Sequence, residues 1–452
     1  MPEDRKPENT LTPLAILLIT LLVLAAILNY VDRLAISAIA PTLKDEFSLT
    51  NERWGWMIAA FNLVYIFSSM FGGMWIDRVG VRKGLLISTI VWSLAAAGHA
   101  LATGFWSLCF WRMLLAVGEG PGAASLLKGV RRLLPPHLRD TGNGLIGAGW
   151  AAGAVIAPLL IGPVAVKFGW QAGFLATASL CLLWIPFWLA FAFRPGVKLG
   201  VEAVKLTSSS DEKPQPLNYR SYALWATLLA IFFTVPPTVF MNGFLSLYLS
   251  GAQHLTQAQI NAQQWKPFLA TDLGQLTGGA VVFLLLRQGW RYLPARRYMI
   301  AIGFLGSVLM LGVLSAPDVY AAIAWLCVSR FYYQAAYTAL GTYGIESVAE
   351  HQTAQFAGLM NAVFSGCNLV FNPLVGRIAD KVGFNLVIVI IAFAPLLGLA
   401  CWLVLSGLHA RSVARTEAAA LAALQPASAL APAPATAPGG VVLTTESPRG
   451  SP

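Results

Sequence analysis

Long apolar stretches, separated by short polar connections, constrain the fold of this chain more than any other feature. Each has about the 20 residues that an α-helix needs to cross a bilayer, and charged residues are rare inside them. They cover residues 14–40, 54–76, 84–103, 105–128, 142–166, 171–193, 222–249, 264–286, 298–315, 319–346, 354–379 and 385–406. The sequence therefore predicts an all-α membrane protein with twelve transmembrane helices.

Composition supports a membrane location. Of the 452 residues, 57% are hydrophobic and 11% are charged, whereas about a quarter of the residues of a soluble domain are charged. The first apolar stretch is too long for a signal peptide and lacks a small-residue cleavage pattern, so we expect it to span the membrane. No Asn-x-Ser/Thr glycosylation sequon occurs. We therefore expect a multi-pass protein in the lipid bilayer of a bacterial inner membrane.

The distribution of Lys and Arg predicts the orientation. Most of these residues lie in the connections that follow even-numbered stretches, at 77–83, 128–139, 194–220 and 287–297. Cytoplasmic connections carry such an excess in membrane proteins. Both termini are therefore expected in the cytoplasm, and the net charge of +10 needs no nucleic-acid partner to explain it.

The polar segment 195–221 divides the chain into two halves. A cytoplasmic segment 1–13 precedes the first half, 14–194; the second half, 222–406, is followed by an Ala/Pro-rich tail, 407–452, expected to be disordered. The sequence around Gly162–Gly169 is echoed around Gly376–Gly383, which suggests a duplication. Parallel repeats with a site between them are one plan for transporters, so we expect two pseudo-symmetric six-helix bundles.

Five charged residues lie where the sequence is otherwise apolar: Asp32, Arg33, Arg112, Glu119 and Arg330. Each charge at bilayer depth costs at least about 2.5–3.5 kcal/mol, which indicates a role in binding or moving a charged solute. Guanidinium groups present a planar fork to carboxylates. The five cysteines are dispersed, without metal-ligand spacing, and no nucleophile elbow or phosphate loop is present. No metal, no cofactor and no enzymatic activity are expected.

Helical geometry separates these charges. Tyr30 and Arg33 share a face of the first stretch, whereas Asp32 lies about 100° away from Arg33. Arg112 and Glu119 lie on one stripe, with about 10 Å between their backbones. We hypothesise that protonation of Asp32 and Glu119 favours loading of an anion. Two alternatives stay open: Arg33 paired with Asp32 as a fixed contact, and Arg112 with Glu119 as an inter-helix bridge.

Other polar groups are candidates for the walls of a cavity. Arg330 is followed by Tyr333 and Tyr337, and it either contacts the solute or pairs with a tyrosine hydroxyl or a backbone carbonyl. The eleventh stretch adds three residues at helical spacing, which line the cavity or bond neighbouring helices: Asn361, Ser365 and Asn368. Pro236, Pro237 and Gly243 predict a break in the seventh stretch and a possible gate.

A specific motif stands between the second and third stretches. It consists of Gly73, Asp77, Arg78, Gly80, Arg82 and Lys83. The spacing and place of these residues resemble the GxxxDRxGxRK signature of the major facilitator superfamily. Glycines allow close helix approach, and an acid beside clustered bases can form a gating latch. The resemblance implies the two-bundle, twelve-helix fold of that superfamily.

A finer resemblance is to the anion:cation symporter family of sugar-acid transporters. It rests on the segments Asn29–Arg33, Trp56–Tyr65, Arg112–Pro121, Lys266–Phe268 and Ala295–Arg297. The resemblance implies proton-coupled symport of an organic carboxylate by alternating access, with protons as the coupling ion, in a protein expected to be a monomer. It implies that Asp32 and Glu119 exchange protons, that Arg33 and Tyr30 hold the carboxylate, that Tyr65 lines the cavity, and that Arg112 ties the two acids together.

The second half departs from that family's pattern. The segment Gly278–Phe283 has no carboxylate where the family has one, and Gln171 stands in place of a common arginine. These departures leave the identity of the anion open. Two other functions also stay open: a proton-independent exchanger of organic anions or organophosphates, and a membrane sensor with a transporter-like body.

Overall fold

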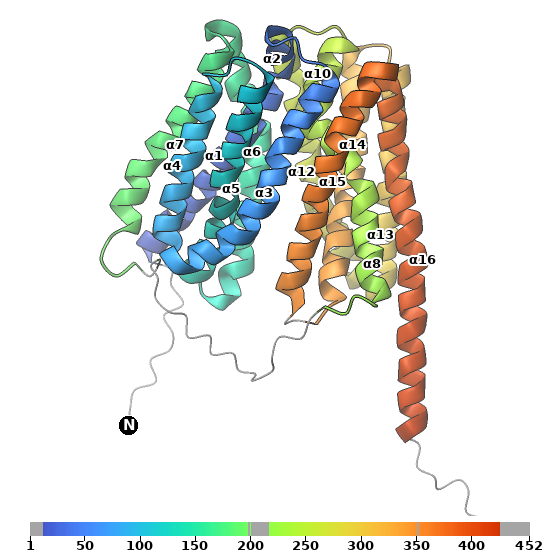
Figure 1. Ribbon diagram of the computed structural model, residues 1–452. Coiled ribbons are helices and arrows are strands. Elements are labelled where there is room, and N and C mark those ends of the chain that lie inside the picture. The colour runs from blue at the N-terminus through green and yellow to red at the C-terminus, as the bar shows by residue number, and fades with distance from the viewer. Residues whose placement is uncertain (1–11, 198, 200–216, 350–351, 425–452) are drawn as a thin grey trace, which may run out of the picture. The chain divides into compact units, whose positions relative to one another are not determined.

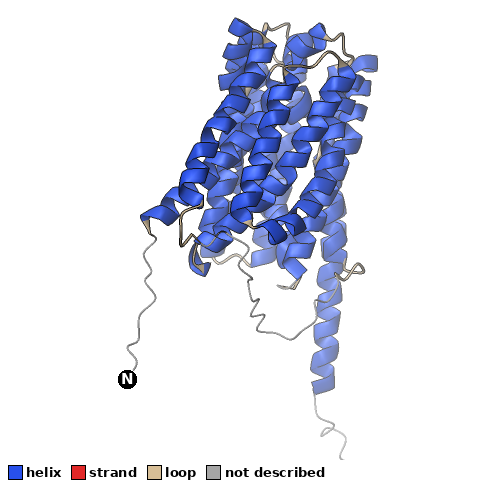
Figure 2. Cartoon of the chain, turned by 60° about the vertical axis from the view of Figure 1, so that its left-hand side comes forward, coloured by secondary structure: helices blue, strands red, loops and turns tan. Residues whose placement is uncertain are grey.

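The computed structural model describes residues 12–197, 199, 217–349 and 352–424. Within these ranges the chain is helical and contains no β-strand (Figure 2). The predicted all-α membrane fold is therefore confirmed. Residues 1–406 form one compact unit, and residues from Gly407 onward form a second.

The first half contributes six long helices (Figure 1). They are α1 (Pro13–Ala38), α3 (Asn51–Val79), α4 (Val81–His99), α5 (Phe105–Leu133), α6 (Arg139–Phe168) and α7 (Trp170–Ala192). The short helix α2 (Ala40–Glu46) follows α1, and a 3₁₀ turn, η1 (Pro136–Leu138), precedes α6. Helix α5 packs against α3 and α4, while α1 packs against α6 and α7. The charged residues of α1 and α5 thereby come into one bundle.

The second half has more interruptions. It consists of α8 (Tyr222–Thr234), α9 (Pro236–Val239), the π-helical turn η2 (Phe240–Phe244), α10 (Leu245–Gly251), α11 (Gln257–Gln263), α12 (Trp265–Arg287), α13 (Tyr292–Ser307), the 3₁₀ segment η3 (Val308–Ser315), α14 (Val319–Glu346), α15 (Thr353–Val382) and α16 (Phe384–Leu424). Helix α14 packs against α12 and α13. The buried Arg330 of α14 thereby contacts α12.

Ten helices in the described residues are long and apolar enough to cross a membrane. Helices α5 and α14 have comparable lengths, 29 and 28 residues, but are not among the ten. Both carry charged and polar residues at their centres, including Arg112, Glu119 and Arg330. The count of twelve spans stays a prediction, because α5 and α14 are not among the ten.

The seventh apolar stretch is broken where its prolines lie. Helix α8 ends at Thr234, and Pro236 and Pro237 begin α9. Prolines have no N–H to donate to the preceding turn. The π-helical turn that follows contains Asn242 and Gly243, and such turns are frequent at functional sites.

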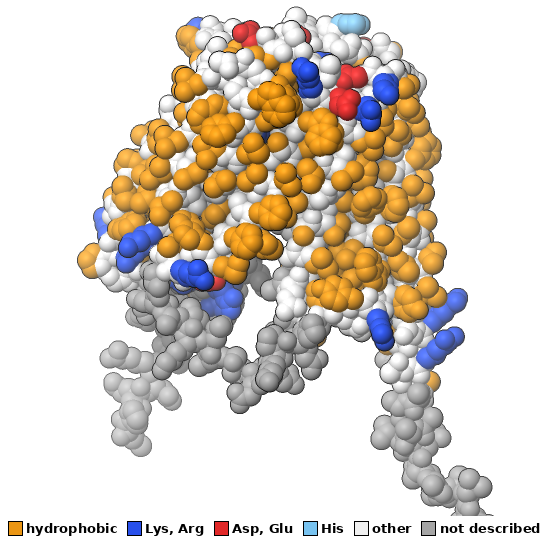
Figure 3. All heavy atoms as spheres, viewed as in Figure 1, with side chains coloured by type: hydrophobic (Ala, Val, Ile, Leu, Met, Phe, Trp, Pro, Cys, Tyr) orange, Lys and Arg blue, Asp and Glu red, His pale blue; other side chains and the backbone are white. Residues whose placement is uncertain are grey.

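The two halves join at one end, which we call the far end. At the opposite end, which we call the linker end, α1 begins, α7 ends and α8 begins (Figure 1). At the far end, Asp380 of α15 accepts hydrogen bonds from the backbone N–H groups of Asn51 and Glu52, at 2.9 and 2.8 Å. Trp54 Nε1 donates to the carbonyl of Gly243 at 2.8 Å. The space-filling view shows a notch between the halves at the linker end (Figure 3). The far end is therefore closed in this conformation.

Glycines make that closure possible. A Cβ atom on Gly376 of α15 would lie 2.1 Å from the carbonyl oxygen of Asn51, and one on Gly55 of α3 would lie 2.3 Å from that of Asn372. Both distances are too short for real Cβ contacts. Backbones of α3 and α15 therefore meet directly at the far end.

The C-terminal segment differs from its prediction. The tail was expected to be disordered from residue 407, but α16 continues to Leu424. The sequence from His409 to Leu424 is rich in Ala and also contains Leu and Arg, all of which favour helix. The prediction of disorder is thus wrong for residues 407–424, and the Ala/Pro-rich remainder lies outside the described residues.

Candidate functional site

A cavity of about 380 Å³ lies between the two halves. Its walls come from α1 and α6 of the first half and from α9, η2, α12, α14 and α15 of the second. Small-molecule sites occupy about 300–1,000 Å³. The cavity therefore has the size of a site for a small solute.

The two walls differ in polarity. The first-half wall contributes the phenol of Tyr30, the indole of Trp150, and small residues of α6. The second-half wall holds two opposite charges, Arg330 and Asp272, together with the polar side chains of Thr238, Asn242, Thr271, Gln275 and Gln334. An anionic solute would therefore find its charge partner on the second-half wall and an apolar platform opposite.

Arg330 is held rigidly in that wall. Its residue surface is only 3% exposed, its Nε donates to Thr271 Oγ1 at 3.3 Å, and its guanidinium carbon lies 4.3 Å from the ring centroid of Tyr333. Within the described residues, its Nη1 has no hydrogen-bond partner. A buried donor without a partner costs free energy, so an acceptor that reached this nitrogen would be stabilised.

The two tyrosines after Arg330 have different surroundings. Tyr333 is buried, its hydroxyl donates to the carbonyl of Thr234, and it also contacts Thr238 Oγ1 at 3.1 Å. Tyr337 lines the cavity and stacks on Tyr333 with 6.0 Å between ring centroids. Tyr333 therefore ties α14 to the helix break, and Tyr337 faces the solute space.

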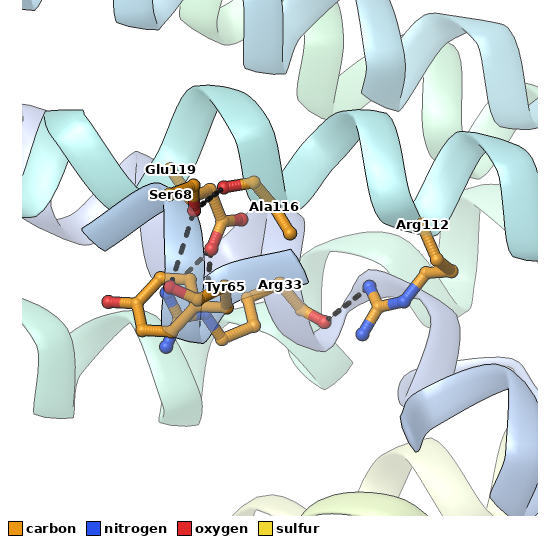
Figure 4. A network of polar contacts seen from close by, with 6 residues as sticks. All are labelled: Arg33, Tyr65, Ser68, Arg112, Ala116 and Glu119. Carbon is orange, nitrogen blue, oxygen red and sulfur yellow. Dashed lines mark hydrogen bonds and ion pairs between the residues drawn. The ribbon is translucent and has the colours of Figure 1, made fainter. Parts of the chain in front are cut away.

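Arg33 pairs with Glu119 and not with Asp32. Its Nη2 and Nε lie 2.6 and 2.7 Å from the same carboxylate oxygen, Oε2 (Figure 4). The side chain of Glu119 is fully buried and that of Arg33 is 22% exposed. Tyr65 lies against the guanidinium, with its ring centroid 4.6 Å from the Arg33 carbon. The guanidinium carbon of Arg33 also lies 5.4 Å from the ring centroid of Tyr30. Of these four residues, Tyr30 alone is among the described residues that line the cavity.

Arg112 does not bridge the two acids in this conformation. Its Nη1 donates to the backbone carbonyl of Arg33 at 3.2 Å, and its guanidinium lies 4.7 Å from the ring centroid of Phe61. Figure 4 shows the side chain reaching the carbonyl of Arg33, with no contact drawn to Glu119. Among the described residues, no hydrogen bond or ion pair joins Arg112 to Glu119, whose carboxylate is bound by Arg33. The predicted tie between Asp32 and Glu119 through Arg112 is absent here.

Asp32 is buried within the first half. Its Oδ2 accepts a hydrogen bond from Cys181 Sγ of α7 at 2.9 Å, and its Oδ1 has no partner among the described residues. The 100° rotation between Asp32 and Arg33 thus gives them different partners, as helical geometry predicts. Sequence reasoning missed Cys181, because its partner lies 149 residues away.

The polar residues of the eleventh stretch are not among the described residues that line the cavity. Asn361 is exposed and Ser365 and Asn368 are buried, and Asn368 Nδ2 donates to the carbonyl of Phe364 in its own helix at 2.9 Å. Phe364 is the residue of α15 that reaches the cavity. The lining role of Asn361, Ser365 and Asn368 stays a prediction.

The motif between α3 and α4 is anchored by a lysine from α5. Lys128 Nζ lies 2.6 Å from Asp77 Oδ1 and donates to the carbonyl of Gly73 at 2.6 Å. Asp77 therefore pairs across helices and not with the adjacent bases. Arg78 and Lys83 are exposed. Close approach comes from Gly72, where a Cβ would lie 2.7 Å from Pro121, whereas a Cβ on Gly73 would meet nothing within 4 Å.

Two further motif residues shape the turn. Gly80 ends α3 and begins α4 with φ of +82°, a conformation that favours glycine. The carbonyl of Arg82 accepts a hydrogen bond from Trp188 Nε1 at 3.0 Å. This hydrogen bond joins the start of α4 to α7.

Sequence reasoning missed one charged residue of the cavity. Asp272 lies in α12, seven residues after its start, and lines the second-half wall. It follows directly after Thr271, which holds Arg330. The signal was available, because Asp272 is an acid inside an otherwise apolar stretch, like Asp32 and Glu119.

Comparisons with known proteins identify relatives of this chain. A hexuronate transporter of Escherichia coli (strain K12) is 27% identical over 414 residues, which cover 88% of this chain and 95% of the relative. A D-galactonate transporter of Escherichia coli O6:H1 is 26% identical over 415 residues, covering 86% and 95%. The predicted resemblance to sugar-acid transporters is thus confirmed.

Solved structures share the fold. A bacterial homologue of the human lysosomal transporter Spinster, in an inward-facing and occupied conformation, has a TM-score of 0.74 at 16% identity, covering 87% of this chain and 97% of that chain. The model of the Major Facilitator Superfamily matches residues 22–371. With most of its length matched by that family, the chain belongs to the Major Facilitator Superfamily.

Proposed function

We propose that this protein carries an organic acid anion, of the sugar-acid type, into the cell by proton-coupled symport. The observation that carries the proposal is Arg330, a buried guanidinium with an unpartnered nitrogen in the polar wall of a 380 Å³ cavity between the halves. A carboxylate would satisfy that nitrogen with a charge-assisted hydrogen bond. Trp150, on the opposite wall, offers a flat apolar surface for the C–H face of a sugar.

The orientation follows from the Lys/Arg distribution. If the linker end is cytoplasmic, as the positive-inside rule favours, the closed far end is the outer face and the structure is inward-facing. Alternating access would then require the contacts around Asp380, Asn51 and Glu52 to break when the site opens outward. A bacterial inner membrane is the location that this proposal assigns.

The ion pair between Arg33 and Glu119 supplies a physical basis for coupling. In this conformation the guanidinium is occupied by an internal carboxylate. Protonation of Glu119 would remove that partner and free Arg33, which lies beside the cavity residue Tyr30, to turn toward the cavity and attract an anion. Proton and anion would then bind together. Coupling requires that the two ligands bind the two facings with different affinity. Asp32 is a second acid that can take a proton, because one of its oxygens is buried without a partner.

Uptake of galacturonate and D-galactonate into proteoliposomes tests the proposal. Arg330→Ala is expected to abolish uptake of whichever sugar acid the wild type carries, while the exposed Arg287 of α12 provides a matched control, Arg287→Ala, with normal uptake. Undiminished uptake by Arg330→Ala would remove the basis of the proposal. Uptake that survives an uncoupler and requires an anion inside the vesicle would identify an exchanger instead.

A further inference from the structure

We propose that Asp272 is a proton-binding site of the second half, and that its protonation is linked to the binding of an anion at Arg330. The inference rests on the proposed function, since it assumes that the cavity takes an anion. It adds a third acid to the two in the first half, and it places this acid in the wall that holds the anion.

The position of Asp272 carries the argument. Its side chain is half-buried and lines the cavity beside Thr271, Gln275 and Arg330. Within the described residues, its carboxylate has no hydrogen bond and no ion pair within 4.0 Å, unlike the carboxylate of Glu119. Asp272 therefore faces the solute space, and no direct hydrogen-bond or ion-pair partner in the described residues fixes its protonation state.

Among the groups that face Asp272 from the surrounding helices in the described residues, one carries a full charge. Helix α14 contributes Arg330, α1 contributes the neutral phenol of Tyr30, and the facing wall of α6 contributes uncharged residues. On α12 itself, Lys266 is bound to Gln263 Oε1 at 2.6 Å, nearly two turns away. The bases of α13 lie near its start, at the linker end, and α11 has no titratable residue.

These charges make anion and proton binding cooperative. With Asp272 ionised, the second-half wall is neutral, because one positive charge faces one negative charge. An anion at Arg330 would then meet a like charge in a partly dehydrated cavity, where Coulomb interactions are stronger than in bulk water. Protonation of Asp272 leaves the wall with a net positive charge. The anion therefore binds more tightly to the protonated form, and by reciprocity the bound anion favours protonation.

The size of the linkage can be bounded. Coupling between two binding events in proteins is typically about 5- to 150-fold in affinity. We expect the affinity of the wild type for the anion to rise by an amount in this range as Asp272 becomes protonated. An Asp272→Asn variant keeps the shape and lacks the charge, so it resembles the protonated state at every pH.

The experiment measures proton uptake on binding. Galacturonate and D-galactonate are titrated calorimetrically into purified full-length protein in buffers of different ionisation enthalpy, which gives the number of protons bound per anion. Wild type, Asp272→Asn and Glu119→Gln are compared. We expect Asp272→Asn to bind fewer protons per anion than the wild type and to lose most of the pH dependence of its affinity. Asp318→Asn, which changes an exposed acid that caps α14, should behave as the wild type.

A second measurement detects the protonated carboxyl group directly. Infrared difference spectra of the wild type, with and without anion, should show a protonated carboxyl band that Glu119→Gln retains and Asp272→Asn lacks. If Asp272→Asn binds the anion with the proton count and the spectrum of the wild type, the inference is overturned and the proposed function stands. Failure of the wild type to bind either sugar acid would overturn the proposed function, and the inference with it.

Discussion

Asp380 offers a direct test of how the far end closes. Its carboxylate is the partner of two backbone N–H groups at the N-terminus of α3, at 2.9 and 2.8 Å, and it comes from the other half of the protein. A carboxylate at a helix N-terminus satisfies unpaired donors and interacts favourably with the helix dipole. These contacts exist only while the far end is closed, so Asp380→Ala should favour the open state.

The magnitude follows from the geometry. Loss of an N-terminal cap costs about 0.5–2 kcal/mol, and the dipole interaction adds about 0.3–1 kcal/mol at an exposed position. Asp380 is exposed, so solvent competes for its bonds and we take a total of about 1–2 kcal/mol. Since about 1.4 kcal/mol corresponds to a tenfold change in an equilibrium constant, the ratio of open to closed far ends should rise about 5- to 30-fold.

The assay is a distance measurement across the far end. Spin labels at Glu46→Cys in α2 and Ala258→Cys in α11, both exposed positions, report the separation of the halves. The background lacks the two partly exposed cysteines, Cys327 and Cys401, and keeps the buried ones. The control is Asp318→Ala, which removes a carboxylate that caps α14 within one half and should leave the distances unchanged. Identical distance distributions in Asp380→Ala and wild type, or an equal shift in the control, would refute the reasoning.

Three further outcomes are expected. Gly376→Ala places a Cβ against the backbone of α3, so it should open the far end in the same assay, whereas Gly366→Ala, at a site where a Cβ meets nothing within 4 Å, should not. Glu119→Gln should abolish sugar-acid-driven proton uptake into liposomes, because Arg33 loses its titratable partner; intact coupled accumulation would exclude that role. Cys181→Ala removes the donor to the buried Asp32 and should lower stability by about 1–3 kcal/mol, measured by thermal unfolding; an unchanged melting temperature would show that water replaces the thiol.

The fold was largely predictable because apolar length is a local property. The breaks at Pro236 and Pro237 were also local, since proline acts on its own turn. The repeated pattern of Gly162–Gly169 and Gly376–Gly383 was visible, but its cause was not. Each repeat ends a helix with a glycine at positive φ, +90° and +91°. The first glycine of each lies against the opposite half, since a Cβ there would meet Asn261 or Asn51 at 2.1 Å.

The site was harder to predict because its contacts are distant in sequence. Helical geometry separates Asp32 from Arg33, yet it cannot select Glu119, 86 residues away, as the partner of Arg33. Asp272 was missed for a different reason. The family resemblance directed attention to an absent acid in the segment Gly278–Phe283, while the acid that lines the cavity lies two turns earlier in α12.

The central claim is that the protein moves a sugar-acid anion together with protons. Uptake of radiolabelled galacturonate and D-galactonate into proteoliposomes, driven by an imposed pH gradient with the acidic side outside, tests it most directly. The account predicts accumulation of at least one of them against its gradient, alkalinisation of the outer medium and loss of both on adding an uncoupler. An absence of flux, or flux that ignores the pH gradient, would contradict it.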